Sequence, residues 1–514
     1  MALKQLTRNA VERYFRTVLL VDERWQLAED RVGKVTTPGL AARSRTTPVT
    51  DTVLQQPAGG DVDVVAMTNA FIKHGMHLAP VRPEAKPETR FAMPIRRVAH
   101  GSDVVVLDWN IYDDDGRRCV HLAKELFAED GGGKLRVLVI YTGQQPDKVE
   151  ATLKESLRVP EFEAGRSSRD NFHVMVLVKP ESTTVTDDSR TASAGDLPER
   201  ILEFVSESMY GILPTVALNA LAAIRDSSQK LLAAFDANLD PGYLGHRALL
   251  RNPEEAADQL PVIVADELRA ILEDPQVAQP GRVEPVCSWI DSPPDGLGPV
   301  DDPDLLKRLH RFGNPYEWPP DAWPGGERPG PRQIYDSQPA LAPLHAPGLN
   351  PNDADERWSL RMSVSSSYGF DPPYLHLGSI LFERLDADGV YWLCLMPLCD
   401  SVRLEAPTVF PLLMLEDRTA ADNRRFNCVV RHDGEWIRLR VPARVDKVEM
   451  VEFGVGDGLV AAGGGRFAST GKRQFEWVAT LKPDVAHRFA QSVGERISRI
   501  GLDESDWLRR WARG

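Results

Sequence analysis

Five polar side chains in the first part of the chain stand at or just after the ends of apolar runs. The runs cover residues 17–21, 103–107, 135–140 and 173–178, and the polar residues are Asp22, Glu23, Asp108, Thr142 and Lys179. Ligands of an open α/β sheet bind outside the carboxyl ends of its strands. If the runs are parallel strands of one sheet, these side chains meet at one edge and form a single site.

The residue types at this edge are suited to accepting a phosphoryl group. A carboxylate can attack a phosphoryl donor and form an acyl phosphate, and Asp108 is placed to be that nucleophile. Asp22, Glu23 and Asp108, with the backbone carbonyl of Asn110, supply the oxygen ligands that Mg²⁺ prefers. Because the cation offsets repulsion between these carboxylates and the incoming group, Mg²⁺ is the expected cofactor.

Two further side chains complete the predicted site. Lys179 would contact a phosphoryl oxygen as a mobile point charge, and Thr142 would donate its hydroxyl to the same group. We therefore predict Asp108 as the phospho-acceptor, with Thr142 and Lys179 as its catalytic partners.

The apolar runs are continuous, as expected for strands that are covered on both faces of a parallel sheet. Helical patterns fall between them, and this alternation predicts a doubly wound α/β domain over residues 1–181. Asp22 and Asp108 are 86 positions apart, with a Thr/Pro/Gly-rich stretch between them. An insertion at about residues 33–90 is therefore expected.

The order of these residues resembles that of the receiver domains of two-component response regulators. An acidic pair, an aspartate, a threonine and a Lys-Pro pair follow one another at successive strand ends within residues 16–181. The resemblance implies a flavodoxin-like fold and a cognate histidine kinase that phosphorylates Asp108. It also implies a regulatory phosphoprotein that is not an enzyme, apart from slow autodephosphorylation.

Two features depart from the receiver pattern. Leu177 replaces the aromatic residue usually found two positions before the lysine, so the receiver switch would have to be rebuilt, for example around Tyr141 or Phe172. Thr142 and Lys179 are 37 positions apart, which predicts an extra loop at 159–169. Phosphoryl acceptance is therefore better supported than the way in which the signal is read.

Three further segments follow the predicted receiver. Residues 197–274 have helical periodicity and are a candidate surface for a homodimer. Residues 279–355 are rich in Pro and Gly and are expected to form an irregular connection. Residues 356–514 show short alternating strands and a terminal helical pattern, which predicts a β-rich C-terminal domain.

Several short stretches resemble a divergent receiver group of bacterial defence proteins. They are residues 107–110, 113–116, 140–143, 240–241, 245–250, 394–403 and 499–508. This resemblance implies the receiver-bearing component of a Detocs-type antiphage phosphorelay, with another receiver of the relay as a partner. No effector motif is found downstream, which favours an intermediate or a phosphate buffer.

The composition argues against two classes of partner. The formal net charge is -14 and no dense basic block occurs, so neither nucleic acid nor a membrane surface is an expected partner. Five scattered cysteines, the lack of a spanning apolar run and the polar N-terminus together predict a cytoplasmic protein.

Two alternatives remain open at this stage. A phosphatase of the haloacid-dehalogenase type also uses an aspartate nucleophile with Mg²⁺, but it needs a second aspartate two positions later, where this chain has Asn110. The other alternative is a receiver that cannot be phosphorylated and serves as a scaffold or binding protein.

Overall fold

The structure, a computed structural model, describes residues 1–24, 63–84, 88–130, 134–169, 171–180, 189–250, 252–293, 303–313, 351–366, 373–385, 388–419 and 426–498. The chain divides into two compact units. One comprises Met1–Asp295 and Val300–Ile334, and the other comprises Gly296–Pro299 and Tyr335–Gly514. Within the described ranges, no helix has the length and apolar character needed to cross a membrane.

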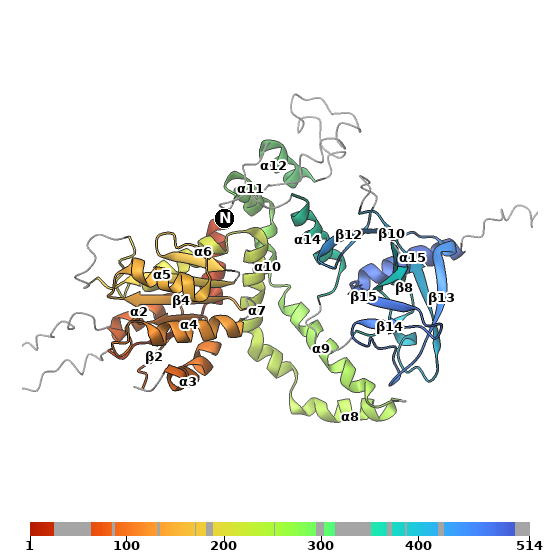
Figure 1. Cartoon of the computed structure of the whole chain (residues 1–514), viewed down its shortest axis with the longest axis horizontal. Helices are drawn as coiled ribbons and strands as arrows, with labels where there is room; N and C mark the ends of the chain where they lie inside the picture. The colour runs from red at the N-terminus through yellow and green to blue at the C-terminus, as the bar shows by residue number, and fades with distance from the viewer. Residues whose placement is uncertain are drawn as a thin grey trace, which may run out of the picture. The chain divides into compact units, whose positions relative to one another are not determined.

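The first unit is built on a six-stranded sheet in the order β2-β1-β3-β4-β6-β5 (Figure 1). Five strands are parallel, and β5 pairs antiparallel with β6 at one edge. The strands are β1 (Thr17–Val21), β2 (His77–Val81), β3 (Val104–Leu107), β4 (Arg136–Thr142), β5 (Arg166–Arg169) and β6 (Phe172–Val178). The order of the parallel strands is that of the flavodoxin-like doubly wound fold, as predicted.

Helices cover both faces of this sheet, because successive strand residues point to opposite sides. On one face α2 and α6 pack on side chains that include Val104 and Tyr141. On the other face α3, α4 and α5 pack on side chains that include Leu107 and Ile140. These helices are α2 (Val64–Lys73), α3 (Glu88–Gly101), α4 (Arg117–Asp130), α5 (Pro146–Leu157) and α6 (Leu197–Ser208).

The predicted insertion at 33–90 is wrong for residues 63–84. These residues form α2 and β2, which belong to the sheet and its cover. The sequence pattern concealed β2 because it is a partly exposed edge strand that contains Pro80, and proline is tolerated at edges. Residues 25–62 lie outside the described residues. The predicted extra loop at 159–169 contains the edge strand β5.

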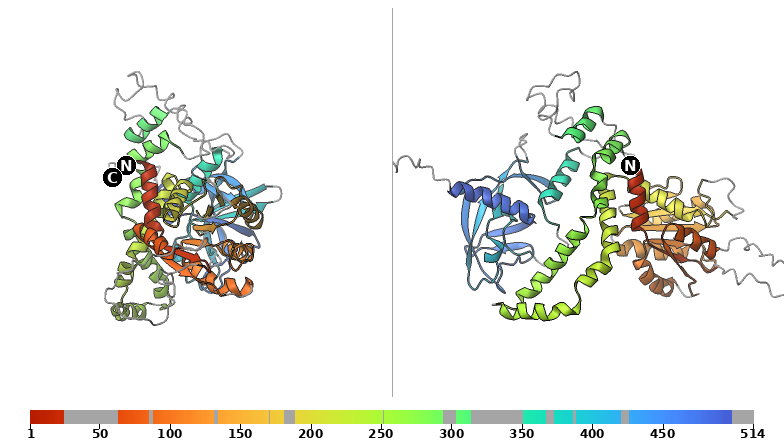
Figure 2. Two further views of the ribbon diagram at one scale, coloured as in Figure 1. Left: turned by 90° about the vertical axis from the view of Figure 1, so that its left-hand side faces the viewer. Right: turned by 180° about the vertical axis from the view of Figure 1, so that it is seen from behind.

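The first unit continues from the sheet into a helical segment (Figure 2). Its helices are α1 (Leu3–Tyr14), α7 (Ile212–Ala234), α8 (Asp240–Leu249), α9 (Glu255–Ile271), α10 (Pro275–Ala278), α11 (Val283–Asp291) and α12 (Pro303–Phe312). The hydroxyls of Thr7 in α1 and Thr215 in α7 are 2.7 Å apart and buried. Arg225 of α7 binds the carboxylate of Asp103, next to β3.

Two of the predicted segments differ from the structure. The division at 181 separates α6 from the sheet, although Ile201 and Val205 of α6 belong to the core on that sheet. The range 279–355, expected to be irregular, contains α11, α12 and the start of α14 (Pro351–Ser363). Prolines at the first turns of α12 and α14 are compatible with helix starts, so a high proline content did not exclude helices there. Residues 294–302 and 314–350 are not among those described.

The second unit is β-rich, as predicted, and contains two antiparallel sheets (Figure 2). The larger has the order β13-β9-β8-β7-β15-β14, and the smaller has the order β10-β12-β11. α15 (Pro483–Ser498) packs against a core that both sheets share. The strands are β7 (Ser379–Leu385), β8 (Asp388–Cys394), β9 (Thr408–Met414), β10 (Glu416–Asp417), β11 (Cys428–His432), β12 (Glu435–Arg440), β13 (Val448–Phe453), β14 (Arg466–Ala468) and β15 (Gln474–Thr480).

Candidate functional site

The ammonium group of Lys179 joins two aspartates at the carboxyl edge of the parallel sheet. Its Nζ lies 2.9 Å from Asp108 Oδ1 and 3.2 Å from Asp22 Oδ2. All three residues are buried. Residues that are 86 and 71 positions apart in sequence therefore meet, because β1, β3 and β6 are parallel and end at the same edge.

Asp108 is held by backbone contacts on both sides. Its N–H donates to the carbonyl of Val21 at 3.0 Å, and its Oδ2 accepts from the N–H of Asn110 at 3.1 Å. Burial raises the pKa of the Asp108 carboxyl; Lys179 acts in the opposite direction, and Asp22 raises the pKa further. Lys179 is therefore the main group that favours the charged form of this desolvated carboxyl.

Lys179 stays protonated for the complementary reason. Burial works against the ammonium, but the Asp108 and Asp22 carboxylates outweigh it, so the pKa of Lys179 is raised. The Nζ also lies 5.6 Å from the centroid of the Tyr141 ring. A cation fixed in this way can balance negative charge that arrives on Asp108.

Glu23 offers a carboxylate oxygen suited to a cation. Its Oε1 pairs with Arg24 at 3.1 Å, whereas Oε2 is buried and has no hydrogen-bond partner in the structure. Burial raises the pKa of this carboxyl, with Asp108 and Asp22 adding to the effect. A buried, unpaired oxygen next to two further carboxylates fits Mg²⁺, which binds oxygen ligands.

The carboxylate oxygens of Asp22, Glu23 and Asp108 do not surround one common point. The Asp22, Glu23 and Asp108 carboxylates do not form a trio with oxygens within 4.8 Å of one another. Lys179 lies between two of them, and Arg24 holds the third. The Asn110 carbonyl, the fourth predicted ligand, accepts a 3.4 Å hydrogen bond from Asp113 N.

Thr142 ends β4 beside this group. Its Oγ1 accepts from the N–H of Gln144 at 2.9 Å, so the hydroxyl hydrogen is left to donate elsewhere. Its carbonyl accepts from the N–H of Lys179 at 2.8 Å, which fixes the two predicted partners of Asp108 side by side.

The loop after Asp108 is built around a buried indole. Trp109 is 1% exposed, and a Cβ added to Gly116 would meet its ring at 2.2 Å. Gly116 also has a φ of +83°, which side chains rarely adopt. This packing fixes the path of the chain that carries Asn110 and leads into α4.

Arg24 was not among the predicted site residues. It contacts Glu23 and also binds Asp113 Oδ1 at 2.6 Å, so it links the loop after β1 to the loop after β3. A basic residue directly after an acidic pair was the available sequence signal, but that signal is common on protein surfaces.

Of the two residues suggested for a rebuilt switch, Tyr141 lies beside the site and Phe172 does not. Phe172 begins β6, whereas Lys179 follows its end. The Tyr141 hydroxyl donates to the carbonyl of Ala192 at 3.0 Å, and the N–H of Ala192 donates to Val178 O at 3.1 Å. Tyr141 therefore connects the site to the segment that leads into α6.

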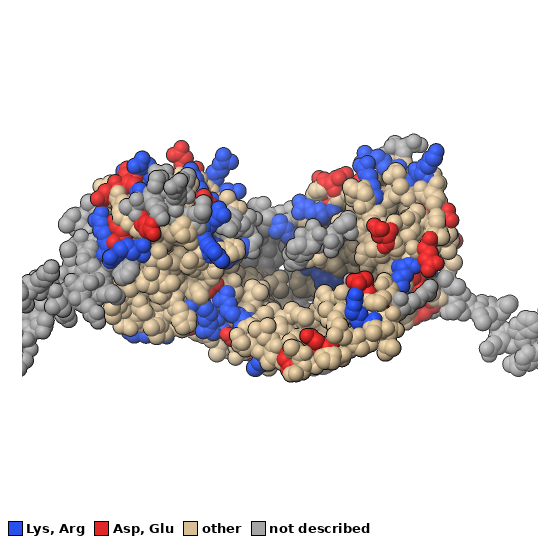
Figure 3. Space-filling view, turned by 90° about the horizontal axis from the view of Figure 1, so that it is seen from below, with Lys and Arg blue, Asp and Glu red and all other residues tan. Residues whose placement is uncertain are grey.

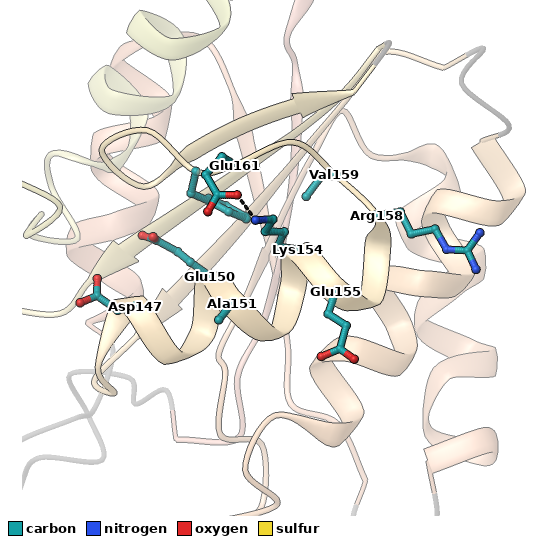
Figure 4. A pocket seen from close by; sticks show the side chains of 9 residues that line it. Asp147, Glu150, Ala151, Lys154, Glu155, Arg158, Val159 and Glu161 are labelled. Carbon is teal, nitrogen blue, oxygen red and sulfur yellow. Dashed lines mark hydrogen bonds and ion pairs between the residues drawn. The ribbon is translucent and has the colours of Figure 1, made fainter.

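A groove elsewhere on this unit runs along α5 (Figure 4). Its charged lining residues are Asp147, Glu150, Lys154, Glu155, Arg158 and Glu161. Lys154 points toward Glu161 and pairs with it. None of the predicted site residues lines this groove.

Comparison with known families gives one result. Residues 14–180 match the family model of the response receiver domain. No curated protein and no solved structure matches the chain. The match confirms the resemblance to receivers for this part of the chain, and such domains are usually regulatory. It does not extend to the defence subgroup or to the second unit.

Proposed function

We propose that the protein is a response regulator that accepts a phosphoryl group from a histidine kinase on Asp108. The supporting observation is the contact of Lys179 with Asp108 at 2.9 Å and with Asp22 at 3.2 Å, buried at the carboxyl edge of a receiver sheet. The lysine at this edge, together with a Mg²⁺ ion held by the carboxylates, would suit an anionic transferring group better than a neutral ligand.

The proposed transfer uses one oxygen of Asp108 as the nucleophile. It forms a bond to phosphorus while the P–N bond of the kinase phosphohistidine breaks, and the electron pair of that bond stays on the imidazole. The Lys179 ammonium moves its contact from the Asp108 carboxylate to the phosphoryl oxygens. The Thr142 hydroxyl donates a hydrogen bond to one of these phosphoryl oxygens. Mg²⁺, held by Asp22, Glu23, Asp108 and the Asn110 carbonyl, would supply charge neutralisation.

The proposal is tested by phosphorylating the full chain with acetyl phosphate and Mg²⁺ and by measuring the mass of the intact protein. We expect one added phosphoryl group in the wild type and none in Asp108→Asn. Asp115→Asn is the matched control, since Asp115 lies in the same loop but is exposed and pairs with Lys148. Labelling that persists in Asp108→Asn would refute the assignment.

The scaffold alternative has its own test. Beryllofluoride with Mg²⁺ mimics an aspartyl phosphate, so it should raise the melting temperature of a functional receiver. If the wild type shows neither labelling nor a shift in melting temperature, the result supports a scaffold that cannot be phosphorylated.

The phosphatase alternative is disfavoured by the Asn110 side chain. Its Oδ1 accepts from Asp115 N at 3.0 Å and its Nδ2 donates to Asp113 at 3.1 Å, so it braces the loop and supplies no acid. Steady turnover of p-nitrophenyl phosphate that is lost in Asp108→Asn would restore this alternative.

We also propose a place for the protein in a relay and a homodimeric assembly. The relay role, as intermediate or phosphate buffer in antiphage defence, rests on the resemblance of the short stretches described above.

The dimer is supported by large apolar side chains that α8 and α9 leave exposed. Leu244, Leu249 and Val262 are 58%, 89% and 59% exposed, and uncharged residues make up most of the surface around α8 (Figure 3). Light scattering of the wild type and of Leu249→Glu tests the dimer.

A further inference from the structure

A second group of side chains with metal-ligating atoms lies in the second unit. His432 ends β11, Asp433 occupies the turn after it, and Glu476 lies on β15. One donor atom from each of the three lies within 4.8 Å of the other two. Residues from two different sheets therefore converge at one place.

The His432 ring is oriented as metal-binding histidines usually are. Its side chain is 9% exposed, and its ring centroid lies 4.7 Å from that of Phe382. The Tyr391 hydroxyl lies 2.9 Å from Nδ1, which leaves Nε2 facing Glu476. Metal-bound histidines generally engage a polar partner through the second ring nitrogen, which fixes the tautomer and the ring direction.

The separation between His432 Nε2 and Glu476 Oε1 is long for a hydrogen bond and is compatible with a shared cation. It is 3.4 Å, whereas a hydrogen bond between nitrogen and oxygen usually measures about 2.9–3.0 Å. Zinc ligands lie about 2.0–2.2 Å from the metal in a tetrahedral arrangement, so two of them stand about 3.4 Å apart.

Within the described ranges, the carboxylates of Asp433 and Glu476 form no salt bridge with lysine or arginine, although Arg466 lies opposite Glu476 in the β14–β15 pair. Glu476 Oε1 instead lies 3.4 Å from Nε2 of the His432 ring. Two carboxylates beside an imidazole form a set of donors that a divalent cation can bind.

The backbone holds this arrangement in place. Asp433 and Gly434 have φ values of +49° and +83°, which belong to the tight turn between β11 and β12. On the other side, the pairing of β15 with β7 shifts register between Trp477 and Ala479, directly after Glu476. Such bulges re-aim neighbouring side chains.

We propose that His432 Nε2 and the carboxylates of Asp433 and Glu476 bind one divalent transition metal of the Zn²⁺ type. An imidazole ligand disfavours Mg²⁺ and Ca²⁺, which prefer oxygen donors alone. The bound metal joins the β11–β12 hairpin of the small sheet to β15 of the large sheet. Three protein ligands leave one tetrahedral position for water or for a further ligand.

The test is a titration of the chelator-treated full chain with Zn²⁺, followed by calorimetry, and with Co²⁺, followed by its visible absorption. We expect one site of this class, and a dissociation constant at least tenfold weaker in His432→Asn and in Glu476→Gln. Tyr391→Phe should weaken binding about 10–100-fold, the usual effect of removing an outer-shell partner. Zn²⁺ should also raise the melting temperature of the wild type and leave that of His432→Asn unchanged.

Two control variants separate this site from other metal-binding groups. His487→Ala removes an exposed histidine of α15, and Cys399→Ser removes the exposed thiol; both should bind Zn²⁺ as the wild type does. Each variant is first checked by circular dichroism without metal. The proposal is overturned if the wild type binds no Zn²⁺, if both ligand variants bind it unchanged, or if Cys399→Ser abolishes binding.

Discussion

Replacing Lys179 by methionine tests whether the buried cation holds the site together. The variant keeps a side chain of similar length but leaves Asp22 and Asp108 buried without their shared partner. With an effective dielectric constant of about 20, contacts of 2.9 and 3.2 Å are each worth about 5–6 kcal/mol of attraction. Desolvation of the ions offsets much of this, so we expect a net loss of about 3–5 kcal/mol in unfolding free energy at neutral pH.

The loss of unfolding free energy in Lys179→Met should become smaller as the pH falls. Burial already raises the pKa of Asp108, and removal of Lys179 raises it further. A carboxyl whose pKa is higher in the folded state favours folding at low pH, and this contribution disappears as the pH rises through the folded-state pKa. The difference between Lys179→Met and the wild type should therefore shrink as the pH falls below neutral.

The assay is urea unfolding followed by circular dichroism at several pH values. Lys148→Met is the matched control, because Lys148 pairs with Asp115 at 2.9 Å but is 61% exposed. An exposed pair of this kind contributes about 0–1 kcal/mol. The double variant Asp108→Asn with Lys179→Met should recover part of the loss. A loss no larger than that of the control, or one that does not change with pH, would refute the reasoning.

Two further predictions concern the first unit. Burial lowers the pKa of His173 from 6.5 to about 4, so the stability that its neutral form provides is present above pH 6.5 and is lost as the pH falls toward 4. The loss amounts to about 3 kcal/mol, and His173→Asn should flatten the dependence of unfolding free energy on pH over this range. Gly116→Ala should cost about 2–4 kcal/mol in chemical unfolding, since its Cβ would meet the Trp109 ring at 2.2 Å and its φ is +83°. A change below about 0.5 kcal/mol would show that the loop adapts.

The receiver part of the fold could be read from the sequence because its strands are buried on both faces. β3, β4 and β6 are runs of apolar residues, and such runs are visible without any knowledge of their partners. The edge strand β2 carries no such run, because among the described strands it has a neighbour on one side only, which is β1. α6 was assigned to the following segment for a related reason: helical periodicity shows that a helix has an apolar face, but not which surface covers that face.

At the candidate sites, too, the sequence predicted residue types and strand ends but not the contacts between side chains. The types of Asp108 and Lys179 and their positions after strands could be read directly, and these two side chains do meet. The shared contact with Asp22, the unpaired oxygen of Glu23 and the bridge made by Arg24 depend on side-chain positions that no spacing encodes. His432 and Glu476 are 44 positions apart and belong to different sheets, so no sequence pattern joins them.

The sequence by itself determined the chemistry that is available to the first unit, because strand ends are local features and parallel strands place their ends at one edge. It also determined the β-rich character of the second unit through short alternating runs. The tertiary structure alone decided which charges neutralise one another, since burial and contact distances set the cost of each charge. It also decided that the helical segment packs with the receiver in one unit, because the buried contacts of α1 and α7 join residues about 200 positions apart.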